Sequence, residues 1–251
     1  PSTEIPSHGG DPLTPGQGAW PVVGASEIPF GAGYPAPRAL SRDDLRRLAD
    51  QFAAAARRAR DAGFEVVELH MAHGYLLHSF LSPLSNARDD EYGGSRENRM
   101  RFPLEVVCAV RAAWPDHLPL FVRLSATDWV DGGWDLEQSI EFAARLRDVG
   151  VDLVDCSSGG LVPDAVVPAG PGFQVPFAAA IRRDARIATG AVGLITEPKQ
   201  AEEIIATGAA DAVLLARAFL RDPYWPLHDA RVLGAEIDWP VSYLRARPNP
   251  A

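Results

Sequence analysis

The sequence predicts an α/β fold of parallel strands covered by helices, and three observations support this prediction. Apolar, strand-like segments alternate with amphipathic helical segments from residue 41 onward. The strand cores are apolar almost throughout, as in parallel strands that are buried on both faces. Polar side chains lie at or just after the carboxyl ends of these strands. In closed barrels, active sites are built on the face formed by the carboxyl ends of the strands. The positions of these polar side chains therefore favour a (β/α)8 barrel over a doubly wound sheet. These polar residues are His70, Arg123, Ser157, Ser158, Thr189 and Arg217.

The first regular segment is a helix over residues 41–63. Residues 1–40 are rich in proline and glycine and show neither the hydrophobic periodicity of a helix nor that of a strand, so they are expected to form an irregular loop region. Ser41 then begins the helix, Asp44 stands in capping-box position, and Gly63 ends it. The predicted buried stripe consists of Leu45, Leu48, Phe52, Ala56 and Ala59.

Three strands and two helices follow in alternation. Strands are predicted at 64–72, 118–126 and 151–159. A helix over about residues 97–114 contains Pro103, which is expected to kink or split it. A helix over 135–150 begins at Asp135 as N-cap and ends at Gly150.

The last part of the chain repeats the same cycle. A short helix near residues 176–183 leads to a strand at 186–192. The next helix is expected to have Thr196 as N-cap and Pro198 in its first turn. The final strand, from residue 210, runs into a helix. Five strands result, whereas a barrel has eight, and three more βα units would need on the order of 100 residues. Residues 1–251 are therefore expected to form one incomplete barrel domain, which carries about the last five βα units.

Composition narrows the class of function. The 251 residues are 47% hydrophobic, which is enough for one large core. The net charge of −9 and the pI of about 5.1 argue against a nucleic acid or an anionic membrane as partner. Two cysteines and no apolar run that could span a bilayer indicate a cytoplasmic protein.

A short motif after the first predicted strand carries the strongest chemical signal. His70 and His73 are three residues apart, and Tyr75 follows. Two imidazole N–H groups aimed at one carbonyl oxygen would stabilise an oxyanion, and the tyrosine O–H could protonate a neighbouring carbon. Two alternatives remain open: satisfied polar groups of the core, or a zinc hydrolase, although no His-Glu-x-x-His pattern supports metal binding.

Two further features indicate an anionic ligand. Gly190 and Gly193 precede a predicted helix, and Arg217 is expected at the end of the last strand, which together suit a phosphate. The alternative is that the glycines serve tight turns only. Arg123 would place a cation on the same face, suited to an anionic ring or a carboxylate, unless it pairs with Asp155 or Glu68.

These residues lie in stretches that resemble the Old Yellow Enzyme family of flavin-dependent ene-reductases, in its YqjM-like (xenobiotic reductase) branch. The longest is "ELHMAHGYLLHSFLSPLSNARDDEYGGSRENRMRF". The others are "FVRLSATDW", "VDLVDCSSGGLV", "ATGAVGLIT" and "ARAFLRDPYW", in consistent order and spacing. Family members have three further strands at their amino-terminal side, for which this sequence has no counterpart.

The resemblance implies a barrel that holds FMN non-covalently and takes hydride from NADPH or NADH. It implies that His70 and His73 bind the carbonyl or nitro oxygen of an activated alkene, such as an enone or a nitroalkene, and that Tyr75 donates the proton. It assigns Arg123 to the flavin ring, and it assigns Gly193, Ala216 and Arg217 to the phosphate. No metal is implied.

The segment "WPVSYLRARP" resembles one in which an arginine reaches a neighbouring subunit's active site, so Arg245 implies a homodimer or homotetramer. The alternative function is a non-catalytic or truncated barrel that needs a partner segment to bind flavin. A dienoyl-CoA reductase usually carries a cysteine-rich cluster, which the two cysteines here do not supply.

Overall fold

A single five-stranded parallel sheet forms the centre of the computed structural model, which describes residues 3 and 10–247. The strands lie side by side in chain order, so each is joined to the next by a helical crossover. They are β3 (Val67–Met71), β4 (Leu120–Ser125), β5 (Leu153–Ser157), β6 (Ala188–Ala191) and β7 (Ala212–Val213). The fold prediction is confirmed: this is the architecture of part of a (β/α)8 barrel.

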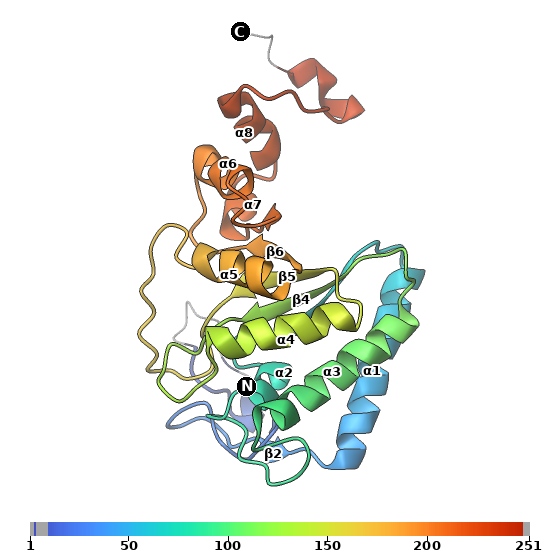
Figure 1. The fold of residues 1–251 in the computed structure, drawn as a ribbon, viewed down its shortest axis with the longest axis vertical. Coiled ribbons are helices and arrows are strands. Elements are labelled where there is room, and N and C mark those ends of the chain that lie inside the picture. The colour runs from blue at the N-terminus through green and yellow to red at the C-terminus, as the bar shows by residue number, and fades with distance from the viewer. Residues whose placement is uncertain (1–2, 4–9, 248–251) are drawn as a thin grey trace.

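Helices cover one face of this sheet. In Figure 1, α4 lies across the strands, with α3 and α1 beyond it, and neighbouring helices contact one another in the pairs α1–α3, α3–α4 and α4–α5. The helices are α1 (Arg42–Asp61), α2 (Leu76–Leu81), α3 (Arg96–Ala113), α4 (Leu136–Asp148), α5 (Val175–Ala185), α6 (Pro198–Ala206), α7 (Arg217–Arg221) and α8 (Trp225–Leu233). The 3-10 helices are η2 (Pro15–Gln17) and η3 (Val241–Ala246).

The register of the strands separates a helix-covered face from an opposite face that carries the charged residues. On the helix side, one row contains Leu69, Val122, Val154 and Thr189, and all four are buried. Thr189 donates its hydroxyl to the Ala178 carbonyl of α5, so it is a packing residue and does not face the predicted site.

The row next to it faces away from the helices, because successive strand residues alternate between faces. It contains His70, Arg123, Asp155, Gly190 and Ala212. The polar side chains of His70, Arg123 and Asp155, on β3, β4 and β5, therefore lie at one height on one face of the sheet. Glu68 precedes His70 by two residues and shares its face.

Local signals set most helix ends as predicted. The Ser41 hydroxyl accepts from the Asp44 amide, and the Asp44 carboxylate accepts from the Ser41 amide, which completes the capping box of α1. Asp135 caps α4 in the same way through the Gln138 amide. Gly63 and Gly150 follow their helices with positive φ angles.

Four predictions need correction. Pro103 does not split α3, which is one helix; the proline is buried, and the packing of the surrounding apolar side chains outweighs one missing hydrogen bond. Glu197, not Thr196, is the N-cap of α6, and Pro198 is its first residue. The last strand is only two residues long, so Arg217 begins α7 instead of ending β7. Within the described part of residues 1–40, the two-residue strands β1 (Val23–Gly24) and β2 (Arg38–Ala39) pair in parallel.

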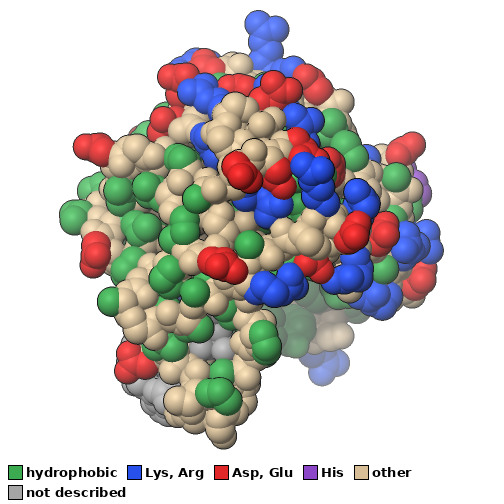
Figure 2. Space-filling model, turned by 90° about the horizontal axis from the view of Figure 1, so that it is seen from below, with side chains coloured by type: hydrophobic (Ala, Val, Ile, Leu, Met, Phe, Trp, Pro, Cys, Tyr) green, Lys and Arg blue, Asp and Glu red, His purple; other side chains and the backbone are tan. Residues whose placement is uncertain are grey.

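The face of the molecule seen in Figure 2 carries a mixture of positive and negative side chains. Lysine and arginine side chains alternate there with aspartate and glutamate. Ion pairs also join surface charges of opposite sign, such as Arg96 with Glu137 and Glu141. Among the described residues, no helix is long and apolar enough to cross a membrane.

Candidate active site

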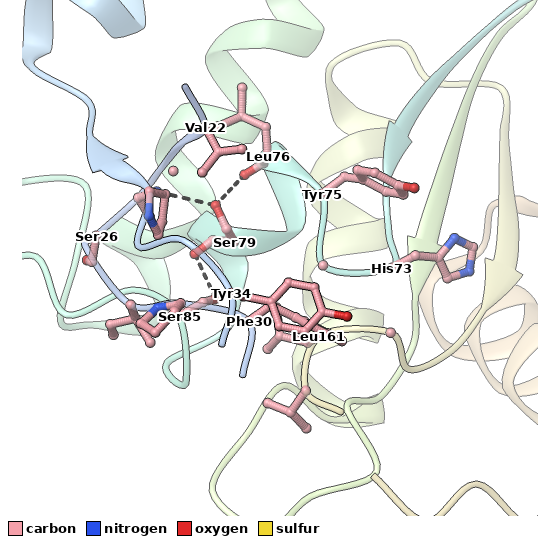
Figure 3. A pocket seen from close by; sticks show the side chains of 18 of the residues that line it. Val22, Ser26, Phe30, Tyr34, His73, Tyr75, Leu76, Ser79, Ser85 and Leu161 are labelled. Atoms are coloured by element: carbon pink, nitrogen blue, oxygen red, sulfur yellow. Dashed lines mark hydrogen bonds between the residues drawn. The ribbon is translucent and has the colours of Figure 1, made fainter. Parts of the chain in front are cut away.

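The histidine–tyrosine motif forms one compact group at the carboxyl end of β3. The ring centroid of His70 lies 5.1 Å from that of His73 and 5.3 Å from that of Tyr75. The side chains of His73 and Tyr75 point to the same side, away from Ser79 (Figure 3). Three polar groups that the sequence places within six residues are therefore also adjacent in space.

A left-handed turn presents this group. His73 and Gly74 have φ angles of 59° and 74°, a conformation that glycine adopts easily and histidine rarely. A Cβ atom at Gly74 would lie 2.4 Å from the Gly160 carbonyl oxygen, so the turn packs directly against the loop after β5. Ser125 holds the turn from β4: its hydroxyl accepts from the His73 amide at 3.0 Å and donates to the Gly159 carbonyl at 2.8 Å.

A buried histidine–aspartate pair, His78 and Asp128, binds the backbone of this turn. The Gly74 amide donates to Nδ1 of His78 at 2.9 Å, so the proton of a neutral His78 ring is on Nε2 and is donated to Asp128 at 2.9 Å. Asp128 also accepts from the Ser82 hydroxyl and the Trp134 amide. Both members of the pair are fully buried. The local sequence gives no role to His78, because its partner lies 50 residues away.

Both motif histidines are neutral near pH 7. Burial, reinforced by the positive charge of Arg123, lowers the pKa of His73 to about 4. Desolvation and Arg123 also lower the pKa of His70. A neutral imidazole carries one N–H donor and one acceptor nitrogen. Nε2 of His73 contacts the Ser157 hydroxyl at 2.7 Å, and within residues 10–247 the other ring nitrogen, Nδ1, has no hydrogen bond to the protein.

Arg123 lies beside His70 in the same row of the sheet and contacts Asp155 at 3.1 Å. The ion pair with Asp155, left open by the sequence, is therefore present. It does not satisfy the whole guanidinium, because Nε of Arg123 is buried without a hydrogen-bond partner. Burial raises the pKa of Asp155 to about 7, with Arg123 opposing this effect and Glu68 adding to it.

The predicted phosphate residues follow two neighbouring strands. β6 and β7 are paired through Ala191 and Val213, so Gly193 and Ala216 come shortly after adjacent strand ends. Gly193 has a φ angle of 115°, and a Cβ atom there would lie 2.6 Å from Nε2 of Gln174. Arg217 is exposed and has no ion pair within residues 10–247. Its guanidinium is available to an anion.

A cavity of about 380 Å³ lies behind the motif, between the loop of residues 22–37 and α2. His73, Gly74 and Tyr75 contribute to its wall (Figure 3). Most other lining side chains are apolar, and the hydroxyls of Ser79 and Ser85 donate to backbone carbonyls. The cavity therefore suits apolar groups.

Arg245 lies on η3, where its side chain is exposed. This carboxyl-terminal segment extends beyond α8, away from the sheet (Figure 1). The structure thus does not bring Arg245 to the histidine motif of its own chain. No group of three or more histidine, cysteine or acidic side chains in the described residues could hold a metal ion.

Comparisons with known proteins place this chain among its relatives. A family model described as the NADH:flavin oxidoreductase / NADH oxidase family matches residues 12–232. The chain belongs to this family. The NADPH dehydrogenase of Geobacillus thermodenitrificans (strain NG80-2) is 50% identical over 224 residues, which cover 89% of this chain and 65% of that protein. The chain thus spans 65% of the length of this curated relative.

Similar solved structures confirm the resemblance to the Old Yellow Enzyme family. The old yellow enzyme homologue from Zymomonas mobilis matches with a TM-score of 0.69 and 27% identity, over 88% of this chain and 63% of that one. A 2-naphthoyl-CoA reductase matches with a TM-score of 0.78 and 28% identity, over 85% of this chain and 33% of that one. The names of these relatives all describe enzymes, which does not favour a non-catalytic barrel.

Membership in the family supports FMN and NADH or NADPH as cofactors. The residues present here fit a flavin. Nε of Arg123 is a buried donor without a partner, and it lies in the same row as His70. The free guanidinium of Arg217 and the turn at Gly193 follow the last two strands on the same rim.

Proposed function

We propose that the whole protein reduces activated C=C bonds, such as those of enones and nitroalkenes, with hydride from NADPH or NADH. One observation carries this proposal: the ring of His70 lies 5.1 Å from that of the neutral His73 and 5.3 Å from that of Tyr75, centre to centre, beside an arginine with a free donor. This combination suits a substrate that develops negative charge on oxygen and needs a proton on carbon.

His70 and His73 would hold the activating oxygen. Each neutral ring has one N–H donor, and two donors that converge on one oxygen stabilise charge that develops there. Because the pKa of His73 is about 4, this ring stays neutral across the physiological range and does not compete as an acid. The histidines therefore act as hydrogen-bond donors.

Tyr75 would supply the proton to the α-carbon. Tyr75 is 56% exposed, so solvent can return a proton to it after each turnover. It stands at the N-terminus of α2, next to His70. The phenol can thus approach the carbon adjacent to the oxygen that the histidines hold.

FMN, when bound, supplies the hydride transfer between the nicotinamide and the alkene. Arg123 would contact the ring with its free Nε–H and favour negative charge on it. Gly193, Ala216 and Arg217 would hold the phosphate. We also propose that the protein is a dimer or a dimer-based tetramer, with Arg245 reaching the neighbouring subunit's substrate site.

Anaerobic kinetics with 2-cyclohexen-1-one test the proposal. The NADPH-reduced protein should be re-oxidised by the enone, and His70→Ala should slow this step by roughly 10² to 10³, the usual cost of one oxyanion donor. FMN affinity should change little. His117→Ala is the matched control, because His117 is exposed in the turn before β4. Equal re-oxidation rates in His70→Ala and wild type would refute the assigned role.

A further inference from the structure

A chain of polar side chains joins the substrate-binding histidine to the turn after β6. Nε2 of His73 contacts the Ser157 hydroxyl at 2.7 Å, and that hydroxyl is 3.5 Å from Oε1 of Gln174. Ser158 donates to the same Oε1 at 2.5 Å, and Nε2 of Gln174 donates to the Val192 carbonyl at 2.9 Å. Ser157 is the last residue of β5 and is buried, so no bulk water competes for its hydroxyl.

The orientation of the Gln174 amide is fixed by its neighbours. Its nitrogen faces a backbone carbonyl, which can only accept, and its oxygen faces the Ser158 hydroxyl at 2.5 Å. Turning the amide over would place an N–H₂ group against Ser158 and an oxygen against the Val192 carbonyl oxygen. Oε1 is therefore the atom that faces Ser157.

The direction of the Ser157 proton follows from the two distances. An O–H donor prefers an acceptor within about 2.5–3.0 Å, so the ring nitrogen at 2.7 Å is a good acceptor and the amide oxygen at 3.5 Å is a poor one. If Nε2 of His73 donated instead, the buried Ser157 hydroxyl would keep only that poor acceptor. Ser157 therefore donates, and Nε2 of His73 accepts.

We propose that Ser157 is a positioning residue that selects the tautomer of His73 with its proton on Nδ1. The functional consequence of this inference rests on the proposed function: the Nδ1–H group of His73 is then the donor that binds the substrate oxygen. Within residues 10–247, no protein group forms a hydrogen bond with Nδ1 of His73. In the opposite tautomer, Nδ1 would present a lone pair to an electron-rich oxygen and would repel it.

Nitrogen NMR of the protein labelled with ¹⁵N-histidine tests the tautomer directly. The protonated and unprotonated ring nitrogens of a neutral imidazole have well-separated chemical shifts. We expect Nδ1–H and an unprotonated Nε2 for His73 in the wild type. Ser157→Ala should shift the ring toward a mixture of tautomers, and Ser157→Thr, which keeps the hydroxyl, should restore it. Ser158→Ala is the matched control and should leave the tautomer unchanged.

Two results would overturn the assignment: an Nε2–H tautomer in the wild type, or the same tautomer in Ser157→Ala as in the wild type. The first result needs no variant, so it decides the matter even if Ser157→Ala does not fold. In kinetics, Ser157→Ala should lower kcat/KM for 2-cyclohexen-1-one about tenfold without changing FMN affinity. A wild-type protein with the Nδ1–H tautomer but no enone turnover would refute the proposed function and still support the role of Ser157.

Discussion

The substitution Asp128→Asn tests whether the buried histidine–aspartate pair supports the active-site turn. Asp128 accepts three hydrogen bonds: from the His78 ring at 2.9 Å, from the Ser82 hydroxyl at 2.6 Å and from the Trp134 amide at 2.7 Å. The Trp134 amide and the Ser82 hydroxyl share Oδ2, and His78 uses Oδ1. An asparagine has one acceptor oxygen in this plane, so one of the two sides must face an N–H₂ group.

The cost can be worked out from these contacts. If the amide oxygen takes the Oδ2 position, the N–H₂ group points at the Nε2–H of His78, and two donors meet. His78 cannot avoid this by moving its proton to Nδ1, because Nδ1 already accepts from the Gly74 amide. The variant loses one hydrogen bond to a charged group and leaves a buried donor unsatisfied. We expect a loss of about 2–4 kcal/mol in the free energy of unfolding.

Urea unfolding, followed by tryptophan fluorescence, measures this loss, because Trp114 and Trp134 are buried. Asp131→Asn is the matched control: Asp131 is exposed in the same loop and should be neutral within about 0.5 kcal/mol. If Asp128→Asn were as stable as Asp131→Asn, the pair would not support the turn. In the folded variant, enone kcat/KM should also fall, because the His78 ring that accepts from the Gly74 amide is no longer held by Asp128.

Three further predictions concern other parts of the site. Gly74→Ala should lower the free energy of unfolding more than Gly132→Ala. Both glycines have φ angles near 75°, but only at Gly74 would an added Cβ meet backbone, 2.4 Å from the Gly160 carbonyl oxygen. Urea unfolding compares the two variants, and equal losses would contradict the close contact. Asp155→Asn should remove a pH dependence of stability. The pKa of Asp155 is about 7 in the folded chain against an ordinary 3.8, so the folded state binds the extra proton and wild-type stability falls as pH rises from about 4 to about 7. The fall is at most about 4 kcal/mol, and unfolding at pH 4.5 and pH 8 would show whether the variant lacks it. Arg245→Ala should change the ratio of kcat/KM between a small and a bulky enone without changing the unfolding midpoint, and an unchanged ratio would argue against a shared site.

The sequence predicted the parts of the fold that depend on neighbouring residues. The α1 capping box needs only Ser41 and Asp44, and both the five parallel strands and their order follow from the apolar runs between helices. The local cost of Pro103 predicts a kinked or split helix, whereas the packing around the helix decides the outcome. Glu197 replaces Thr196 as N-cap without a side-chain hydrogen bond, so the local capping signal was misleading there.

In the site, too, the sequence predicts contacts between neighbouring residues and misses contacts between residues far apart in the chain. The proximity of His70, His73 and Tyr75 follows from their spacing at a strand end, and the structure brings them together. The supporting contacts join residues far apart in the chain: His73 to Ser157 over 84 residues, and His78 to Asp128 over 50. Gln174 carried no signal in the sequence. Such contacts depend on the register of neighbouring strands, which a single sequence does not specify.

Titration of the protein with FMN, followed by the quenching of flavin fluorescence, tests most directly whether the histidine group and the anion-binding residues share one rim. The account predicts saturable binding of one FMN per chain. Arg217→Leu and Arg123→Leu should each weaken this binding, because one removes a phosphate contact and the other a ring contact. His73→Ala should leave it unchanged. Absence of binding, or equal affinity in the wild type and both arginine variants, would contradict the account.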